Sequence, residues 1–201
     1  MSTYIRNFYP GVYCHIYNRG AARQNIFNDD IDYLTYLKKL REIREKCDIS
    51  LICYCLMPNH LHLLVRQDGE MSISRFMHSL HTRYSMYFNK KHNRSGHLFQ
   101  GAFRQKNIED DRYLLHLSFY IHLNPVANKS NTDLENYKWS SYPDYIGKRN
   151  GTLCDKEMII REQSIEEYKQ LVKKVREEME ESQKEKGKGS PFNLWLNEAK
   201  S

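Results

Sequence analysis

Cysteine is scarce in this sequence and long apolar runs are absent, which limits the kinds of protein it can encode. The 201 residues include five cysteines, an odd number, and their spacing matches no zinc ribbon. No stretch approaches the roughly 20 apolar residues of a membrane-spanning helix, and the first 20 residues lack the apolar core of a secretory signal. These absences argue against disulfide-rich secreted proteins and integral membrane proteins. We therefore expect a cytoplasmic protein with reduced thiols.

Acidic residues are missing from one long internal stretch. Residues 71–108 contain no Asp or Glu, although the whole chain has 25. The net charge is +6, and residues 155–201 carry nearly equal numbers of acidic and basic side chains, so the basic excess lies earlier in the chain. This distribution favours a polyanionic partner such as a nucleic acid.

The hydrophobic pattern predicts a mixed α+β protein. Alternation with a period of two predicts strands at 11–20, 49–57 and 60–66, and a further strand near 104–108. Helical spacing predicts helices at 29–47, 72–91 and 110–124, the last ending before Pro125, and a charged helix from Ser164. The segment 137–147 has no regular pattern.

This order of elements predicts the fold. Strand, helix, two strands, helix, strand and helix are typical of a mainly antiparallel sheet flanked by helices, in a split βαβ (ferredoxin-like) arrangement. We expect one domain over residues 1–150 and a charged helical C-terminal extension over 151–201. The extension is nearly neutral in charge, so packing or dimerisation suits it better than DNA binding does.

A pair of histidines interrupts the apolar strand at 60–66. Alternate side chains of a strand share a face, so His60, His62 and Leu64 point to one side of the sheet. Two imidazoles on one face can bind a single divalent ion. The alternative is a pair of partly buried histidines held by hydrogen bonds, which is the commoner situation for an isolated pair.

A tyrosine and an asparagine form a second candidate set. Tyr120 and Asn124 are four residues apart on a predicted helix and therefore lie on one face, one turn apart. The tyrosine hydroxyl is a possible nucleophile and the Asn124 carbonyl a possible metal ligand. Taken alone, the pattern favours Tyr120 as a core residue, because Leu117 and Leu123 lie near it and the chain has 15 tyrosines.

These residues lie in a stretch, from about Tyr13 to Tyr145, that resembles the single-tyrosine HUH transposases of small insertion sequences, the IS200-like family. The closest branch is the REP-associated tyrosine transposases, whose targets are repetitive extragenic palindromes. The matching segments are NRGAARQNIF, YCLMPNHLHLLV, RYSMYFNKKHNRSGHLFQGAF, YLLHLSFYIHLNPV and WSSY.

The resemblance implies an HUH nuclease core and a specific chemistry. His60 and His62 would bind Mg²⁺ or Mn²⁺ with Asn124 as the third ligand, and Tyr120 would be the nucleophile. In the family, that tyrosine attacks a phosphodiester of single-stranded DNA and forms a 5′-phosphotyrosine with a free 3′-OH. A second transesterification rejoins the strands.

Basic residues near these candidates predict how DNA is held. Cations track phosphates and aromatic rings can stack on unpaired bases, although the same residues could form a solvated face over a core. The predicted DNA-binding residues are Asn18, Arg19, Arg83, Lys90, Lys91, Arg94, Arg104 and Lys106.

Three hypotheses of different classes follow. The first is a DNA strand transferase acting on hairpin or palindromic single-stranded DNA, with no membrane partner, as a monomer or homodimer. The second is a domesticated relative that binds hairpin DNA or RNA without cutting it, and the third is a structural protein with an incidental histidine pair. The intact set of Tyr120, His60, His62 and Asn124 favours the first.

Overall fold

The computed structural model describes residues 8–127, 132–161 and 164–186. No helix within these ranges is long and apolar enough to cross a bilayer. The strands are β1 (Tyr13–Arg19), β2 (Ile49–Met57), β3 (His60–Gln67) and β4 (Arg104–Ile108). The helices are α1 (Asp30–Cys47), α2 (Ile73–Lys91), α3 (Asp111–Ala127), α4 (Tyr142–Tyr145), α5 (Glu157–Ile160) and α6 (Ile165–Lys186), with a 3₁₀ turn at Ala21–Arg23.

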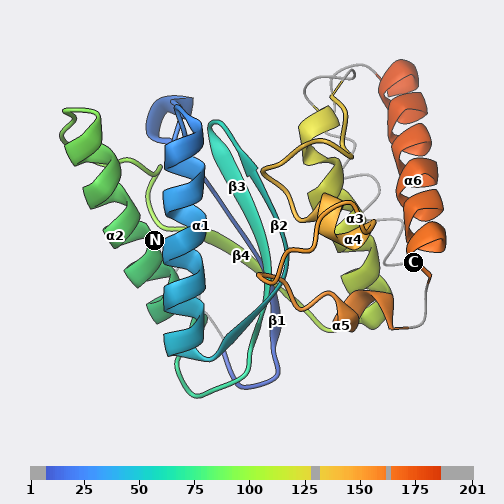
Figure 1. The fold of residues 1–201 in the computed structure, drawn as a ribbon, viewed down its shortest axis with the longest axis horizontal. Coiled ribbons are helices and arrows are strands. Elements are labelled where there is room, and N and C mark those ends of the chain that lie inside the picture. The colour runs from blue at the N-terminus through green and yellow to red at the C-terminus, as the bar shows by residue number, and fades with distance from the viewer. Residues whose placement is uncertain (1–7, 128–131, 162–163, 187–201) are drawn as a thin grey trace.

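The four strands form one antiparallel sheet in the order β2-β3-β1-β4. Strand β3 lies between β1 and β2, which are joined through α1, so the sheet is a split βαβ arrangement with β4 added at the other edge. The predicted α+β fold class is therefore confirmed (Figure 1).

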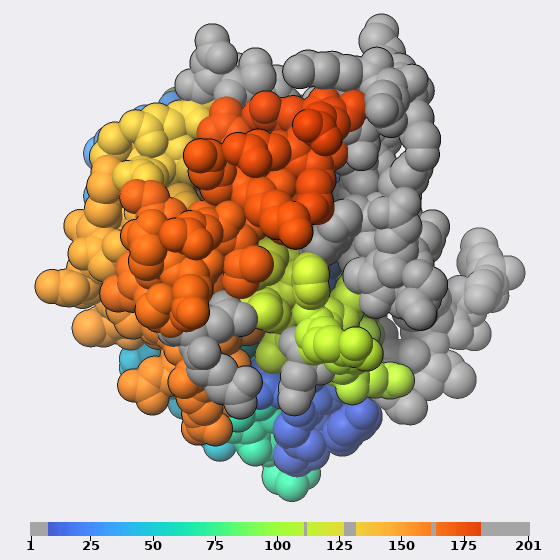
Figure 2. Space-filling model, turned by 90° about the vertical axis from the view of Figure 1, so that its right-hand side faces the viewer, coloured from blue at the N-terminus to red at the C-terminus, as the bar shows by residue number. Residues whose placement is uncertain are grey.

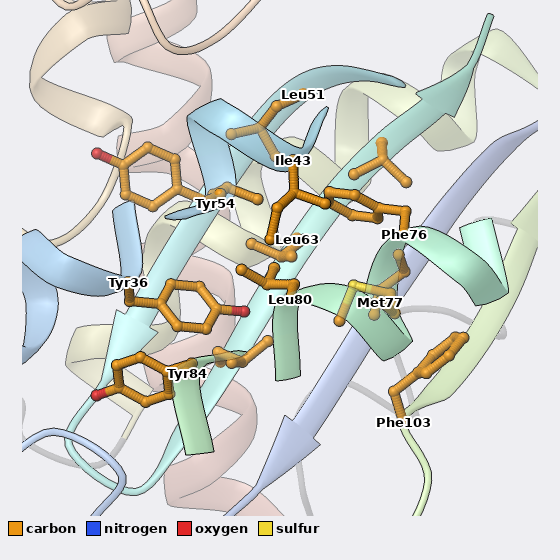
Figure 3. Packing of buried hydrophobic residues seen from close by; sticks show 14 of the residues in the cluster. Tyr36, Ile43, Leu51, Tyr54, Leu63, Phe76, Met77, Leu80, Tyr84 and Phe103 are labelled. Atoms are coloured by element: carbon orange, nitrogen blue, oxygen red, sulfur yellow. The ribbon is translucent and has the colours of Figure 1, made fainter. Parts of the chain in front are cut away.

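Helices α1 and α2 cover one face of the sheet and α3 lies against the other (Figure 1). The first core contains Leu61, Leu63 and Val65 of β3 together with residues of both helices. Figure 3 shows Leu63 of β3 among side chains of α1 and α2. These are the residues that alternate with His60 and His62, so the histidines point toward α3.

A second core fills the space between the sheet and α3. It includes Leu64 of β3, Leu117 and Ile121 of α3, and Tyr168 and Val172 of α6. Helix α6 packs on α3, and Figure 2 looks onto this outer layer. The C-terminal helix thus contributes to the core that supports α3, while the expected boundary at residue 150 stays a prediction.

Local sequence signals explain the helix ends, with two corrections. Asp29 caps α1 by accepting a hydrogen bond from the Asp32 amide at 3.0 Å, and Ser72 caps α2. The expected stop before Pro125 is wrong, because α3 continues to Ala127. Pro125 has no N–H to donate to the carbonyl four residues earlier, so one helical hydrogen bond is missing there. The segment 137–147 also contains the short helix α4.

Candidate active site

The sheet face beneath α3 presents a row of polar side chains. In the register of the sheet, His60 lies opposite Arg19, and His62 lies opposite Tyr17. Tyr17 in turn lies opposite Arg104 of β4. Directly opposed residues share a face, so Arg19 lies beside His60, and Arg104 lies on the same face one strand beyond Tyr17.

Helix α3 brings Tyr120 and Asn124 to the same histidines. The Tyr120 ring stands edge-on to the His62 ring, with centroids 5.7 Å apart and planes at 89°. Asn124 lies close enough to His60 to influence the pKa of the imidazole, and its Nδ2 donates to the Tyr120 carbonyl at 3.0 Å. The structure thus brings together all four residues that the sequence singled out for chemistry.

Both imidazoles form a hydrogen bond through Nδ1. Asn59 Oδ1 lies 2.7 Å from His60 Nδ1, and His15 Nε2 lies 3.0 Å from His62 Nδ1. His15 and Asn59 were not predicted. His15 could have been found from the alternation of β1, where it falls on the same face as Tyr17, but only the register places it beside His62.

Burial keeps these imidazoles uncharged. It lowers the pKa of His60, against the opposing effect of the hydrogen bond with Asn124. Burial, with contributions from His15 and His60, lowers the pKa of His62 well below its ordinary value. Burial and the nearby Lys106 charge lower the pKa of His15 to about 3. Neutral imidazole is the form that binds a metal ion.

A metal ion at this position would need Asn124. Within the described ranges, no group of three or more His, Cys, Asp or Glu side chains is arranged to hold a metal ion. Cys53 and Cys55 are fully buried in the second core, and burial raises the pKa of both thiols, so they stay protonated. The donor set at the histidine pair is therefore two imidazoles and one amide oxygen, which suits Mg²⁺ or Mn²⁺ better than a closed zinc site.

The Tyr120 phenol is protonated at neutral pH. Burial raises its pKa to about 12, although the hydrogen bond with Asn124 acts in the opposite direction. A phenol with such a pKa is a weak nucleophile unless nearby positive charge stabilises the oxyanion. Chemistry at Tyr120 therefore requires cations close to the reacting oxygen.

A pocket of about 390 Å³ opens beside the histidine pair and supplies positive charge. None of its lining residues is acidic, and Arg19, Arg23 and Arg104 all line it together with Asn18. Tyr120 and Asn124 are not among the residues that line it. Three of the predicted DNA-binding residues, Asn18, Arg19 and Arg104, therefore line the same pocket. Arg23 was not predicted, because no local sequence pattern indicates the shape of the turn at 20–24.

The other predicted DNA-binding residues lie elsewhere or are already engaged. Lys91 forms ion pairs with Asp29 and Asp32. Arg94 donates to Gln24 Oε1 at 2.7 Å, and Lys106 Nζ donates to a tyrosine hydroxyl at 2.7 Å. Arg83 and Lys90 are exposed on α2, in the layer across the sheet from α3. Their contact with DNA stays a prediction.

A split βαβ sheet that presents a His-Leu-His pair to a tyrosine on an adjoining helix is the arrangement of the single-tyrosine HUH class. Residues 9–124 match the family described as Transposase IS200 like. The match spans more than half of the chain, and the protein belongs to this family.

A solved structure shares the fold. A REP-associated tyrosine transposase bound to a REP hairpin aligns with a TM-score of 0.61 and 16% identity, over 74% of this chain and 87% of that one. A putative transposase from Deinococcus radiodurans R1 aligns with a TM-score of 0.43 and 14% identity, over 59% of this chain and 95% of that one. No curated protein matches the sequence.

Proposed function

We propose that this protein is a metal-dependent transposase that nicks and rejoins single-stranded DNA through a 5′-phosphotyrosine. The observation that carries the proposal is the meeting of Tyr120 and Asn124 on α3 with His60 and His62 on β3. Membership of the IS200-like family supports it.

Tyr120 would perform two transesterifications. In the first, its phenolic oxygen attacks a phosphorus atom as the phenolic proton leaves. The bond from phosphorus to the 3′ oxygen breaks, and that oxygen takes up a proton to become a free 3′-OH. In the second, a 3′-OH attacks the phosphotyrosine and restores the Tyr120 phenol. Each step exchanges one phosphoester bond for another, so no external energy source is required.

His60, His62 and Asn124 would hold the divalent cation. Both imidazoles are neutral and use Nδ1 for other hydrogen bonds, which fits ligation through Nε2. When bound, Mg²⁺ or Mn²⁺ polarises a phosphate oxygen and offsets developing negative charge. Because these three ligands are uncharged and no acidic residue lines the pocket, a DNA phosphate would supply the compensating charge. We therefore expect tighter Mn²⁺ binding when DNA is present.

The substrate would be single-stranded DNA containing a hairpin or palindrome. The similar transposase structure is described as bound to a REP hairpin, and the arginines that line the pocket suit a phosphate backbone. The alternative is a domesticated protein that binds hairpin DNA or RNA without cutting it. The intact tyrosine and ligand set favours the catalytic form.

The test uses a matched pair of tyrosines on α3. Tyr120→Phe removes only the hydroxyl and should abolish both cleavage and the covalent adduct on labelled hairpin DNA with Mn²⁺. Tyr113→Phe is the control, because Tyr113 lies on the same helix and its hydroxyl contacts Lys106 rather than the histidines. Adduct formation by the Tyr120→Phe protein, or a labelled peptide that maps to another tyrosine, would refute the assignment. DNA binding without any adduct in the wild type would favour the non-catalytic alternative.

A further inference from the structure

The His60 ring is connected to a distant turn through the side chain of Asn59. Asn59 Oδ1 lies 2.7 Å from His60 Nδ1. On its other side, Asn59 Nδ2 donates to the backbone carbonyl of Arg23 at 3.5 Å. The amide thus bridges the start of β3 and the 3₁₀ turn that follows β1.

This bridge determines which atom of Asn59 faces the histidine. A backbone carbonyl can only accept a hydrogen bond, so the amide atom that faces Arg23 must be the nitrogen. The atom that faces His60 is then the amide oxygen, which also can only accept. Consequently His60 Nδ1 carries the proton and donates it to Asn59, and in the neutral ring Nε2 has a free lone pair.

The Arg23 carbonyl is itself held in place by an unusual turn. Ala22 and Arg23 both adopt left-handed backbone angles, with φ of 51° and 60°, a conformation that disfavours non-glycine residues. Gly20 begins the turn, and a Cβ there would lie 2.0 Å from the Gln24 carbonyl oxygen. Only glycine fits at position 20.

The turn is also fastened to the connection between β2 and β3. The Gly20 amide donates to the Asn59 carbonyl at 2.9 Å, and the amides of Ile26 and Phe27 donate to the Pro58 carbonyl at 2.7 Å and 3.0 Å. These backbone hydrogen bonds keep Asn59 and the Arg23 carbonyl at a fixed separation. The strained angles persist because the surrounding bonds determine them.

We propose that Asn59 is a positioning residue that fixes His60 in the Nδ1-protonated tautomer and leaves Nε2 unprotonated. The metal-binding consequence rests on the proposed function. The tautomer is a property of the metal-free protein and can be tested separately.

The experiment records ¹⁵N–¹H correlations of the histidine rings in the metal-free full chain. The His60 signals are assigned by their loss in His60→Gln. The wild type should show a protonated Nδ1 and an unprotonated Nε2. Asn59→Ala should populate the other tautomer, whereas Asn59→Asp should keep the wild-type pattern, since a carboxylate also accepts from Nδ1. The proposal is overturned if the wild-type ring is protonated at Nε2, or if the tautomer is unchanged in Asn59→Ala. If Asn59→Ala does not fold, the wild-type measurement alone still tests the tautomer.

Mn²⁺ titration of the same proteins separates the two proposals. Loss of a group that orients a metal ligand should weaken Mn²⁺ binding by about 10- to 100-fold in Asn59→Ala, and Asn59→Asp should restore it. If wild type binds no Mn²⁺ with or without hairpin DNA, the proposed function fails, while the tautomer result still stands. If wild type binds and Asn59→Ala binds equally well, the positioning role is refuted.

Discussion

Replacing Lys91 with methionine should destabilise the protein and leave its affinity for DNA almost unchanged. The sequence places Lys91 among the DNA-binding candidates, but its ammonium group contacts both Asp29 oxygens at 2.6 and 2.8 Å and Asp32 Oδ1 at 2.8 Å. The Asp32 side chain is completely buried. Lys91 therefore neutralises a carboxylate that has no access to solvent.

The loss of stability depends on the hydrogen bonds that the Asp32 carboxylate retains. Without Lys91, its carboxylate still accepts hydrogen bonds from the Asn28 amide at 2.9 Å, the Tyr87 hydroxyl at 3.1 Å and His92 at 2.9 Å. A buried charge that loses one partner but retains others should cost about 2 kcal/mol, near the middle of the range for an unsatisfied buried group. For a chain of this length, that lowers the Tm by about 4–8 °C.

Arg104→Met is the matched control for this substitution. Arg104 is exposed and lines the pocket beside the histidines, so its replacement should change stability by less than about 0.5 kcal/mol. Loss of one phosphate contact should reduce the slope of log affinity against log salt for single-stranded DNA by about 0.7. The two variants are compared by thermal unfolding and by DNA titration at several salt concentrations. The opposite pattern, a stable Lys91→Met protein with a reduced salt slope, would refute the reasoning.

Three further predictions concern stability. Ala22→Gly should stabilise the fold by about 0.5–1 kcal/mol in urea unfolding, because relief of the left-handed strain exceeds the extra freedom of the unfolded chain; destabilisation would show that the turn is not strained. His15→Phe leaves a buried nitrogen of His62 without its partner and should cost about 1–3 kcal/mol, whereas an unchanged midpoint would contradict that hydrogen bond. Although burial acts to raise the pKa of Asp32, hydrogen bonds from Lys91, the Asn28 amide and His92 lower it overall. Its contribution to stability is therefore complete above the unfolded-state pKa of about 3.9 and is lost as the pH falls through the lower folded value, so acid unfolding curves of wild type and Lys91→Met should converge at low pH.

The sequence was sufficient for the sheet, its flanking helices and the faces on which the four candidate residues lie. The repeat of a strand in β3 and the repeat of a helix in α3 each fix which side chains share a face. His60 and His62 therefore point the same way in the structure, as do Tyr120 and Asn124. Family resemblance then predicted that the two faces meet.

The sequence was insufficient where position depends on register or on an irregular turn. His15 becomes a partner of His62 only through the pairing of β1 with β3. Asn59 and Arg23 gain their roles from the turn at 20–24, whose left-handed residues carry no glycine signal at 22 or 23. The role of Lys91 depends on the packing of α2 against the start of α1, which no local pattern encodes.

Residue 23 performs two tasks with different parts of the same amino acid. Its backbone carbonyl holds Asn59, whereas its side chain lines the pocket beside the histidines. Any amino acid provides the carbonyl, so a substitution at position 23 can change the lining of the pocket while the acceptor for Asn59 remains. Over evolutionary time, this separation would allow the pocket to change at position 23 while Gly20 and Asn59 preserve the orientation of His60.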